Sequence, residues 1–200
     1  MIADLIELAG EVADALGARV TVSASVAHDL RNASSGLVAT LEFAADVAIG
    51  ATSITLRLPS DATGLTGQVP KGLVLTIAGE TSKTVAADAL AGNDLIVLRL
   101  AAGLAAAHLE GVAVGLAATA AFVCPDGIEQ GVGFAPGMVE IASGELLIPM
   151  AGAPALFRPR LDTILTITNP LDGRARKVRV VSEPQVFAGQ AWSLLFSGTS

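Results

Sequence analysis

The side chains best suited to catalysis or metal binding are few and widely separated in this 200-residue chain. His28 and His108 have no Cys, Asp or Glu at a spacing typical of metal sites, and the neighbouring Asp29 would point to the opposite face of a strand from His28. Cys124 ends an apolar stretch, where a buried small hydrophobic side chain is the usual explanation, and the sequence identifies no base beside it. We therefore predict no catalytic residue, no metal site and no cofactor.

The glycine-rich stretch GVGFAPG resembles a dinucleotide-binding loop only superficially. Its glycine spacing is wrong, Pro136 interrupts it, and no alternation of strand and helix surrounds it. We interpret 126–137 as a long connecting loop whose apolar side chains either contact another subunit or pack in the core. The candidate residues of a channel or interface loop are Asp126, Gly131, Gly133, Phe134, Pro136 and Gly137.

The net charge of −7 disfavours a protein that wraps nucleic acid, because such proteins need an excess of Lys and Arg. The charge is uneven, however: 1–157 carries a net −10, whereas 158–200 carries a net +3. This basic end is either a solvated strand edge or a patch for an acidic partner. The candidate basic contact residues are Arg174, Arg176, Lys177 and Arg179.

The first 17 residues have the pattern of an amphipathic helix. Apolar residues recur at helical spacing from Ile2 to Leu16, and Gly17 provides the stop. The candidate acidic face consists of Asp4, Glu7, Glu11 and Asp14. The helix could pack on its own domain or on a neighbouring subunit. The acidic start differs from the basic start of a signal peptide, and a lone cysteine favours a reduced cytoplasmic setting.

The rest of the chain has a mainly β texture. Short runs such as SITLRL and DLIVLRL alternate apolar with polar residues, and Gly, Pro, Asn and Asp separate them at intervals of about ten residues. Such spacing predicts small barrels or sandwiches, with a meander as the simplest order for the last eighty residues. NPLDGRAR predicts a hairpin loop. The longest uncharged apolar stretch, 111–124, is too short to cross a bilayer.

Two stretches together resemble parts of phage virion proteins. MVEIASGELLIP, then DTILTI, a hairpin, KVRVVSEP and WSLLFSG, resembles the end of small head-tail connector proteins of long-tailed bacteriophages. The region from ATSITLRLP through GLVLTIAGETSKTVAAD to EGVAVGL is similar to a β module inserted in phage virion proteins. The resemblance implies a connector β-barrel domain made of 1–44 and 117–200, with an N-terminal helix over 1–17 and an inserted β module over 45–116.

The resemblance further implies a structural virion protein and not an enzyme. Members form a homo-oligomeric ring, usually of six copies, in the phage neck, where it closes or guides the DNA channel as a stopper. The implied partners are a portal or adaptor protein on the head side, a tail terminator or tail tube protein on the tail side, and genomic DNA in passing, with no membrane. The implied location is the virion neck, assembled in the host cytoplasm. The length and glycine content of 126–137 make this loop the candidate for facing the channel.

Alternatives from two classes remain open. A tail terminator or a capsid decoration protein would be another virion component of the same kind. A small β-barrel hydrolase should show clustered acids and histidine, and a carbohydrate-binding module should show exposed aromatic rings. The chain has no tyrosine and one tryptophan, Trp192.

Overall fold

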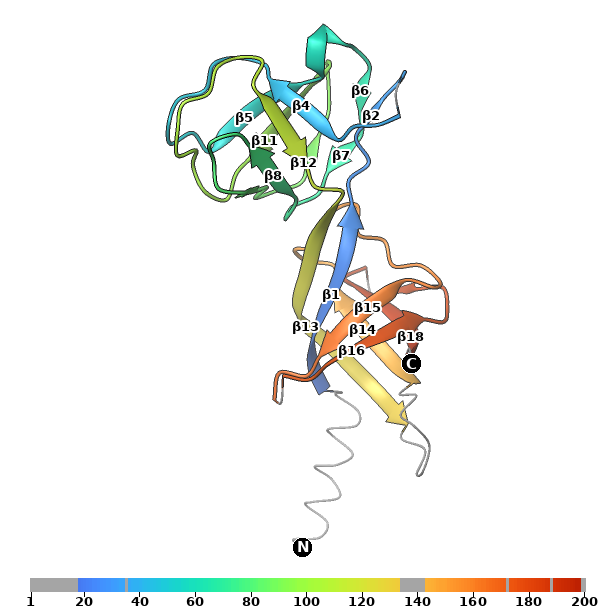
Figure 1. The fold of residues 1–200 in the computed structure, drawn as a ribbon. Helices are drawn as coiled ribbons and strands as arrows, with labels where there is room; N and C mark the ends of the chain where they lie inside the picture. The colour runs from blue at the N-terminus through green and yellow to red at the C-terminus, as the bar shows by residue number, and fades with distance from the viewer. Residues whose placement is uncertain (1–17, 35, 134–142, 172, 188, 199–200) are drawn as a thin grey trace, which may run out of the picture. The chain divides into compact units, whose positions relative to one another are not determined.

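The computed structural model describes residues 18–34, 36–133, 143–171, 173–187 and 189–198, and these are mainly β-strand (Figure 1). The described part of the chain forms two compact units. Unit 1 comprises 18–24, 123–153 and 158–198, and unit 2 comprises 25–122 and 154–157. The expectation of a mainly β protein is therefore confirmed. The predicted helix over 1–17 lies outside the described residues.

Unit 1 is built on a seven-stranded sheet with the order β14-β13-β1-β15-β16-β18-β17. β14 also pairs with β18 along its whole length, from Ser143 opposite Ser197 to Pro149 opposite Ala191, so the sheet curls back on itself. The order is not the expected meander, because β1 from the start of the chain lies between β13 and β15. The strands are β1 (Ala18–Ala27), β13 (Thr119–Gly133), β14 (Ser143–Pro149), β15 (Ile164–Thr168), β16 (Ala175–Val180), β17 (Gln185–Phe187) and β18 (Ala191–Gly198).

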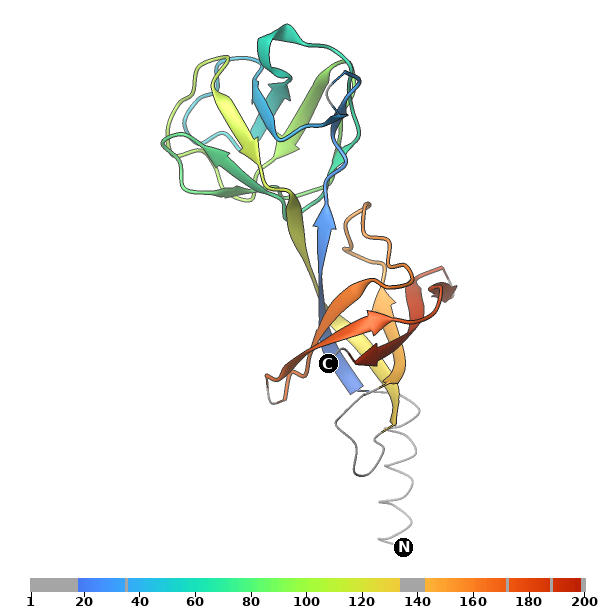
Figure 2. The same ribbon diagram turned by 45° about the vertical axis from the view of Figure 1, so that its right-hand side comes forward.

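The hairpin predicted at NPLDGRAR is confirmed, since β15 and β16 pair antiparallel from Thr168 opposite Ala175 to Ile164 opposite Arg179. The Gly173 N–H donates to the Asn169 carbonyl (2.9 Å), and Gly173 adopts a φ of +69°. This positive φ explains why a glycine ends the turn. The tip of the hairpin lies beside the start of β1 in both views (Figures 1 and 2).

The core of unit 1 comes from alternate positions of its strands, as expected for a sheet with one buried face. In β18, for example, Trp192, Leu194 and Phe196 are buried, whereas Leu195 between them is half exposed. The buried set also includes Val20, Val22, Leu146, Ile148, Leu165, Ile167, Val178 and Val180.

Unit 2 contains a barrel made from a six-stranded sheet with the order β11-β5-β4-β12-β8-β9. Its ends meet where Val85 bridges Leu100, with the Ala86 N–H donating to the Arg99 carbonyl (2.7 Å) and the Ala101 N–H donating to the Thr84 carbonyl (2.8 Å). Closure satisfies the edge strands, which would otherwise expose unpaired backbone groups. These strands are β4 (Thr40–Phe43), β5 (Ser53–Arg57), β8 (Val74–Ile77), β9 (Lys83–Thr84), β11 (Leu95–Arg99) and β12 (Ala113–Leu116).

Short elements complete unit 2. β3, β2 and β6 form one small sheet, and β10 pairs with β7 in another. A 3-10 turn, η1, spans Pro59–Asp61. The short strands are β2 (Arg31–Asn32), β3 (Gly36–Leu37), β6 (Leu65–Thr66), β7 (Gln68–Val69) and β10 (Ala89–Leu90).

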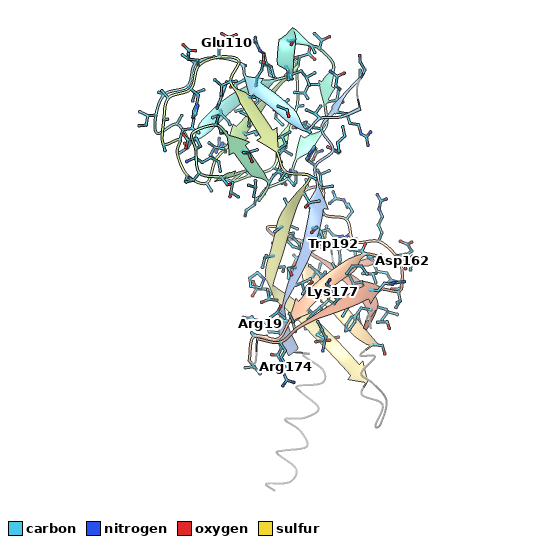
Figure 3. The ribbon with its side chains drawn as sticks, in the orientation of Figure 1. Arg19, Glu110, Asp162, Arg174, Lys177 and Trp192 are labelled. Carbon is cyan, nitrogen blue, oxygen red and sulfur yellow. The ribbon has the colours of Figure 1, made fainter. Side chains whose placement is uncertain are left out.

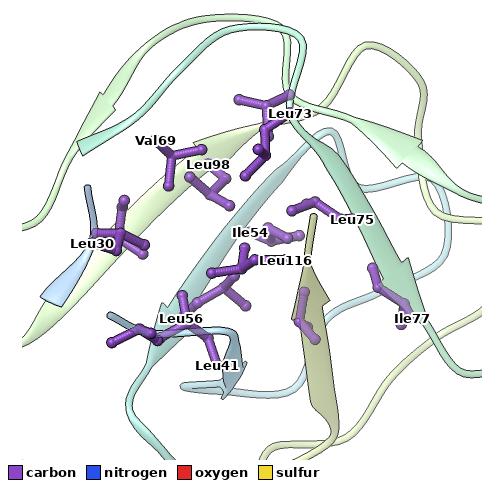
Figure 4. Close-up of a cluster of buried hydrophobic side chains, with 14 of the residues drawn as sticks. Leu30, Leu41, Ile54, Leu56, Val69, Leu73, Leu75, Ile77, Leu98 and Leu116 are labelled. Carbon is purple, nitrogen blue, oxygen red and sulfur yellow. The ribbon is translucent and has the colours of Figure 1, made fainter. Parts of the chain in front are cut away.

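Aliphatic side chains fill the barrel of unit 2 (Figure 4). Leu41, Leu56, Leu73, Leu75 and Leu98 are all fully buried, and each comes from the inward face of a strand or the residue beside one. In β5 the buried residues are Ile54 and Leu56, as the alternation in SITLRL predicts.

The division between the units differs from the boundaries expected at residues 45 and 116. β4, which precedes residue 45, pairs with both β5 and β12 and so belongs to the barrel of unit 2. The division instead falls within β1 after Ala24 and within β13 after Phe122. A boundary inside a continuous strand leaves no turn signal in the sequence, and this explains the difference.

Candidate interaction surface

The outer face of β16 carries a row of positive charges. Val178 and Val180 of β16 face inward and are buried. Lys177 and Arg179 alternate with them, so they point outward and are exposed. Arg19 also lies on the outer side of its strand, β1, because Val20 is buried. Arg174 is exposed at the hairpin, but it is an odd number of positions from Lys177 and Arg179, so alternation does not place it on their face. We call Arg19, Lys177 and Arg179 the cationic face; Figure 3 labels Arg19 and Lys177.

Hydroxyl side chains surround the cationic face. Lys177 lies opposite Thr166 on β15, and Thr166 lies opposite Ser23 on β1. Thr21 and Thr168 form the next outward pair, towards the hairpin. Short side chains leave the longer Lys and Arg groups standing above the sheet, and hydroxyls can donate or accept hydrogen bonds. The surface is suited to carboxylates or other anions.

Two ion pairs on this face are long and solvated. Arg179 Nη1 lies 3.7 Å from Asp162 Oδ1, and Arg19 Nη1 lies 3.7 Å from Asp126 Oδ1, with all four side chains more than half exposed. On unit 2, by contrast, Arg57 is held by Glu42 at 2.9 Å and by a second carboxylate at 3.1 Å. Long, solvated pairs are worth little, so a partner could replace them at small cost.

Arg176 does not belong to this face, contrary to the expectation that it contacts a partner with the other basic residues. It occupies an inward position on β16, opposite Ile167, and its guanidinium donates to the carboxylate of Glu129 on β13. The same guanidinium lies 5.9 Å from the centre of the Phe196 ring. Glu129 is buried, so Arg176 neutralises an internal charge. The sequence could not show this pairing, because the two residues are 47 positions apart.

The prediction of a loop over 126–137 is wrong for 126–133, which belong to a strand. Asp126, Gly131 and Gly133 are part of the long strand β13, and Phe134, Pro136 and Gly137 lie outside the described residues. Gly127 explains one of the glycines: a Cβ there would lie 2.6 Å from Val22 Cγ2. This glycine allows two strands to approach closely.

Pro125 and Asp126 are consecutive exposed residues within β13. Before them the even-numbered Phe122 and Cys124 are buried, whereas after them the odd-numbered Gly127 and Glu129 are buried. The set of alternate residues that faces inward therefore changes at this point. Proline cannot donate to a strand ladder, and an extra residue is a common way to accommodate it. This shift is what turns Glu129 inward, towards Arg176.

A second feature of unit 1 is an open hollow of about 570 Å³ on the outer side of β13, β14 and β18. Gln130, Glu145 and Leu195 form one cross-strand row there, and Val181 lies beside them. Leu195 and Val181 are 51% and 47% exposed, and the Ser193 hydroxyl donates to the Glu145 carboxylate (2.6 Å). Two aliphatic side chains beside a carboxylate make a surface distinct from the cationic face.

Unit 2 contains a charged cluster that was missed from sequence. Glu80 Oε1 lies 3.0 Å from His108 Nε2, and Glu80 Oε2 lies 3.0 Å from Lys83 Nζ. The backbone N–H of Ala105 also donates to this carboxylate (2.8 Å), and the Lys83 ammonium donates to a backbone carbonyl (2.7 Å). The Glu80–Lys83 spacing in GETSK was a local signal, but His108 joins only through the fold.

The cluster around Glu80 has a structural explanation. The hydrogen bond from the Ala105 backbone, followed by that from His108, lowers the pKa of Glu80 to about 2. The His108 ring also stacks on Phe43 of the barrel core, with ring centres 5.4 Å apart. The carboxylate therefore fastens the loop around residue 105 to the barrel wall. Within the described ranges, no group of three or more His, Cys, Asp or Glu side chains could hold a metal ion.

The remaining two candidates for chemistry are buried. Burial lowers the pKa of His28, against a smaller opposing effect of Asp29. Among the residues placed in the structure, His28 Nδ1 has no hydrogen-bond partner. Burial raises the pKa of Cys124, which keeps the thiol protonated and unreactive. The acidic residues Asp4, Glu7, Glu11 and Asp14 lie outside the described residues.

Comparisons with known proteins identify no relative. No protein-family profile, no curated protein and no solved structure matches this chain. In the part of the chain that the structure describes, no helix is long and apolar enough to cross a membrane. A functional inference is therefore based on the chemistry of the surfaces described above.

Proposed function

We propose that this protein is a structural component of the neck of a long-tailed bacteriophage, where copies form a ring that joins the portal to the tail and helps to close or guide the DNA channel. The observation that carries the proposal is the separation of charge. The chain has a net charge of −7, yet unit 1 gathers Arg19, Lys177 and Arg179 on one sheet face. Such separation favours contacts between unlike surfaces of neighbouring copies.

The distinct surfaces of unit 1 support this assembly. A ring needs a heterologous contact, in which one patch of a copy binds a different patch of the next. Unit 1 offers the cationic face on β1, β15 and β16, and the hollow with half-exposed Leu195 and Val181 on β13, β14 and β18. Half-exposed aliphatic side chains become buried when subunits associate.

The role in the neck adds partners above and below the ring. We propose that a portal or adaptor protein contacts one side and a tail terminator or tail tube protein the other, while genomic DNA passes through. A net negative chain suits such a channel, because each phosphate neutralised by Lys or Arg adds affinity that would hold the DNA. Unit 2, nested between β1 and β13, would be an added module on this ring.

The test is direct imaging and mass measurement of the purified chain. Negative-stain electron microscopy and mass photometry at micromolar concentration should show rings or a concentration-dependent oligomer. Purified portal particles and tail tubes, incubated separately with the protein, then decide its place: binding to portals supports a connector, and binding to tubes alone supports a tail terminator. A strict monomer that binds neither preparation would contradict the proposal.

A further inference from the structure

We propose that the tip of the β15–β16 hairpin of one copy inserts Leu171 into the open hollow on β13, β14 and β18 of the next copy. The inference rests on the proposed ring and names the contact that joins its subunits. The two surfaces lie at different places on unit 1, so one copy can bind the next through unlike patches. Such a heterologous contact repeats from copy to copy, as a ring requires.

The hairpin tip presents an apolar side chain to solvent. Leu171 is 94% exposed, more than any other large hydrophobic side chain among the residues that the structure describes. Pro170, which precedes it, is also exposed. Because single exposed leucines are common on protein surfaces, the order of this loop and its match to the hollow carry the inference.

Hydrogen bonds hold the tip in one shape. The Leu171 N–H donates to Asn169 Oδ1 (2.9 Å). The Gly173 N–H donates to the Asn169 carbonyl (2.9 Å), and the Asn169 N–H donates to the Arg174 carbonyl (3.0 Å). A loop fixed in this way loses little conformational entropy when it binds, which favours it as the anchor of an interface.

The hollow offers an apolar surface that can receive this side chain. Val181 and Leu195 lie side by side there, because the Val181 N–H donates to the Leu195 carbonyl (2.9 Å). Their side chains are about half exposed, and the hollow of about 570 Å³ has room for a leucine between its walls. Insertion of Leu171 would remove apolar surface of all three side chains from water.

Unlike charges flank the two surfaces. The hairpin side, 169–180, contains four basic residues and one acidic residue. The segments on the β14 and β18 side of the hollow, 143–149 and 181–198, contain Glu145 and Glu183 but no Lys or Arg. Glu145 itself lines the hollow. This complementarity favours a second copy of the chain as the occupant, because its hairpin combines a basic character with an exposed apolar tip.

A hairpin cannot reach the hollow of its own copy. β16 begins at Ala175, beside the hairpin tip, and ends at Val180, directly before Val181 of the hollow. Extended chain from Ala175 to Val181 spans about 20 Å. The tip and this edge of the hollow therefore lie at opposite ends of β16, and the loop extends away from the strands in both views (Figures 1 and 2).

Two variants of the full chain test the contact. The tip variant is Leu171→Asp, and the hollow variant is Leu195→Asp. Each places a carboxylate in an apolar contact, so each alone should associate at least about tenfold more weakly than the unmodified protein. An equimolar mixture should form a 1:1 dimer and nothing larger. The intact tip of the hollow variant then fits the intact hollow of the tip variant, and no second contact can form.

Sedimentation velocity of each variant and of the mixture measures these effects. The unmodified protein should associate more weakly at about 500 mM than at about 50 mM salt, because unlike charges flank the contact.

Controls separate the contact from folding and from charge. Leu109→Asp makes the same chemical change at an exposed leucine of unit 2, and it should assemble like the unmodified protein. Trp192 fluorescence and circular dichroism check that unit 1 remains folded. If Leu195→Asp does not fold, Val181→Asp, which changes the residue directly after β16, replaces it with the same expected result.

Three results would overturn the inference while the unmodified protein still forms rings. One is assembly of either the tip variant or the hollow variant at the unmodified affinity. Another is a mixture that stays monomeric or forms full rings, because a contact of tip with hollow allows only the dimer. The last is an equal loss of assembly in the unit 2 control. Failure of the proposed function itself shows differently, as an unmodified chain that never associates, and it contradicts the ring and this contact together.

Discussion

Replacing Arg176 by alanine should destabilise unit 1 far more than replacing Arg174, although both are basic residues of the same hairpin. Arg176 binds the carboxylate of Glu129, whose side chain is 6% exposed, and lies over the Phe196 ring. Breaking a buried pair by removing one partner costs about 3–5 kcal/mol. The Arg176 side chain is 39% exposed, so water can replace part of the lost contact. We therefore expect a loss of about 2–3 kcal/mol for Arg176→Ala.

Urea unfolding followed by fluorescence measures this loss, because the one tryptophan, Trp192, is buried in unit 1 and reports that unit alone. At an m value of about 1.3 kcal/mol/M, the midpoint for Arg176→Ala should fall by about 2 M. Arg174→Ala, which changes an exposed residue, should stay within about 0.5 kcal/mol of the unmodified protein. Replacing the pair together, as Arg176→Met/Glu129→Leu, should recover most of the stability. Equal midpoints for the two alanine variants would refute the inward pairing of Arg176.

Three further predictions concern titration and close packing. The pKa of Glu80 is lowered from 4.5 to about 2, so its carboxylate stabilises the fold above pH 4.5 and this contribution is lost as pH falls towards 2. The difference in Tm between the unmodified protein and Glu80→Gln should therefore shrink over that range. Burial lowers the pKa of His28 below 6.5, so the folded state favours the neutral ring and loses stability as pH falls below that value. His28→Gln should reduce this dependence of Tm on pH in thermal unfolding. An unchanged dependence would assign it to other groups. Gly127→Ala should lower the urea midpoint of unit 1, because the added methyl would lie 2.6 Å from Val22 Cγ2; a midpoint equal to the unmodified one would show that the strands can separate without cost.

Local alternation was enough to predict many of the strands. SITLRL and KVRV contain apolar residues at every second position, and β5 and β16 follow with those residues buried. The β15–β16 hairpin was predictable for a similar reason, since its turn chemistry lies within a few consecutive residues. A prediction from neighbouring residues succeeds where the physical cause is itself local.

The candidate surface was only partly predictable. The sequence grouped Arg174, Arg176, Lys177 and Arg179 as one basic patch, but alternation along β16 turns Arg176 inward and leaves Lys177 and Arg179 outside, while Arg174 lies at the hairpin. Arg19, more than 150 residues earlier, joins them because β1 pairs with β15 in the sheet. The local sequence contains no signal that Arg176 leaves this surface or that Arg19 joins it.

The sequence by itself determined that this chain is mainly β, that its positive charge gathers near the C-terminal end, and where a tight turn reverses the chain. Only the tertiary structure decided which strand lies beside which, and hence that Glu129 meets Arg176, that His108 meets Glu80, and that β4 belongs to the barrel of unit 2. The physical reason is that strand order and barrel closure depend on pairing between distant segments, whose free energy no short stretch of residues contains.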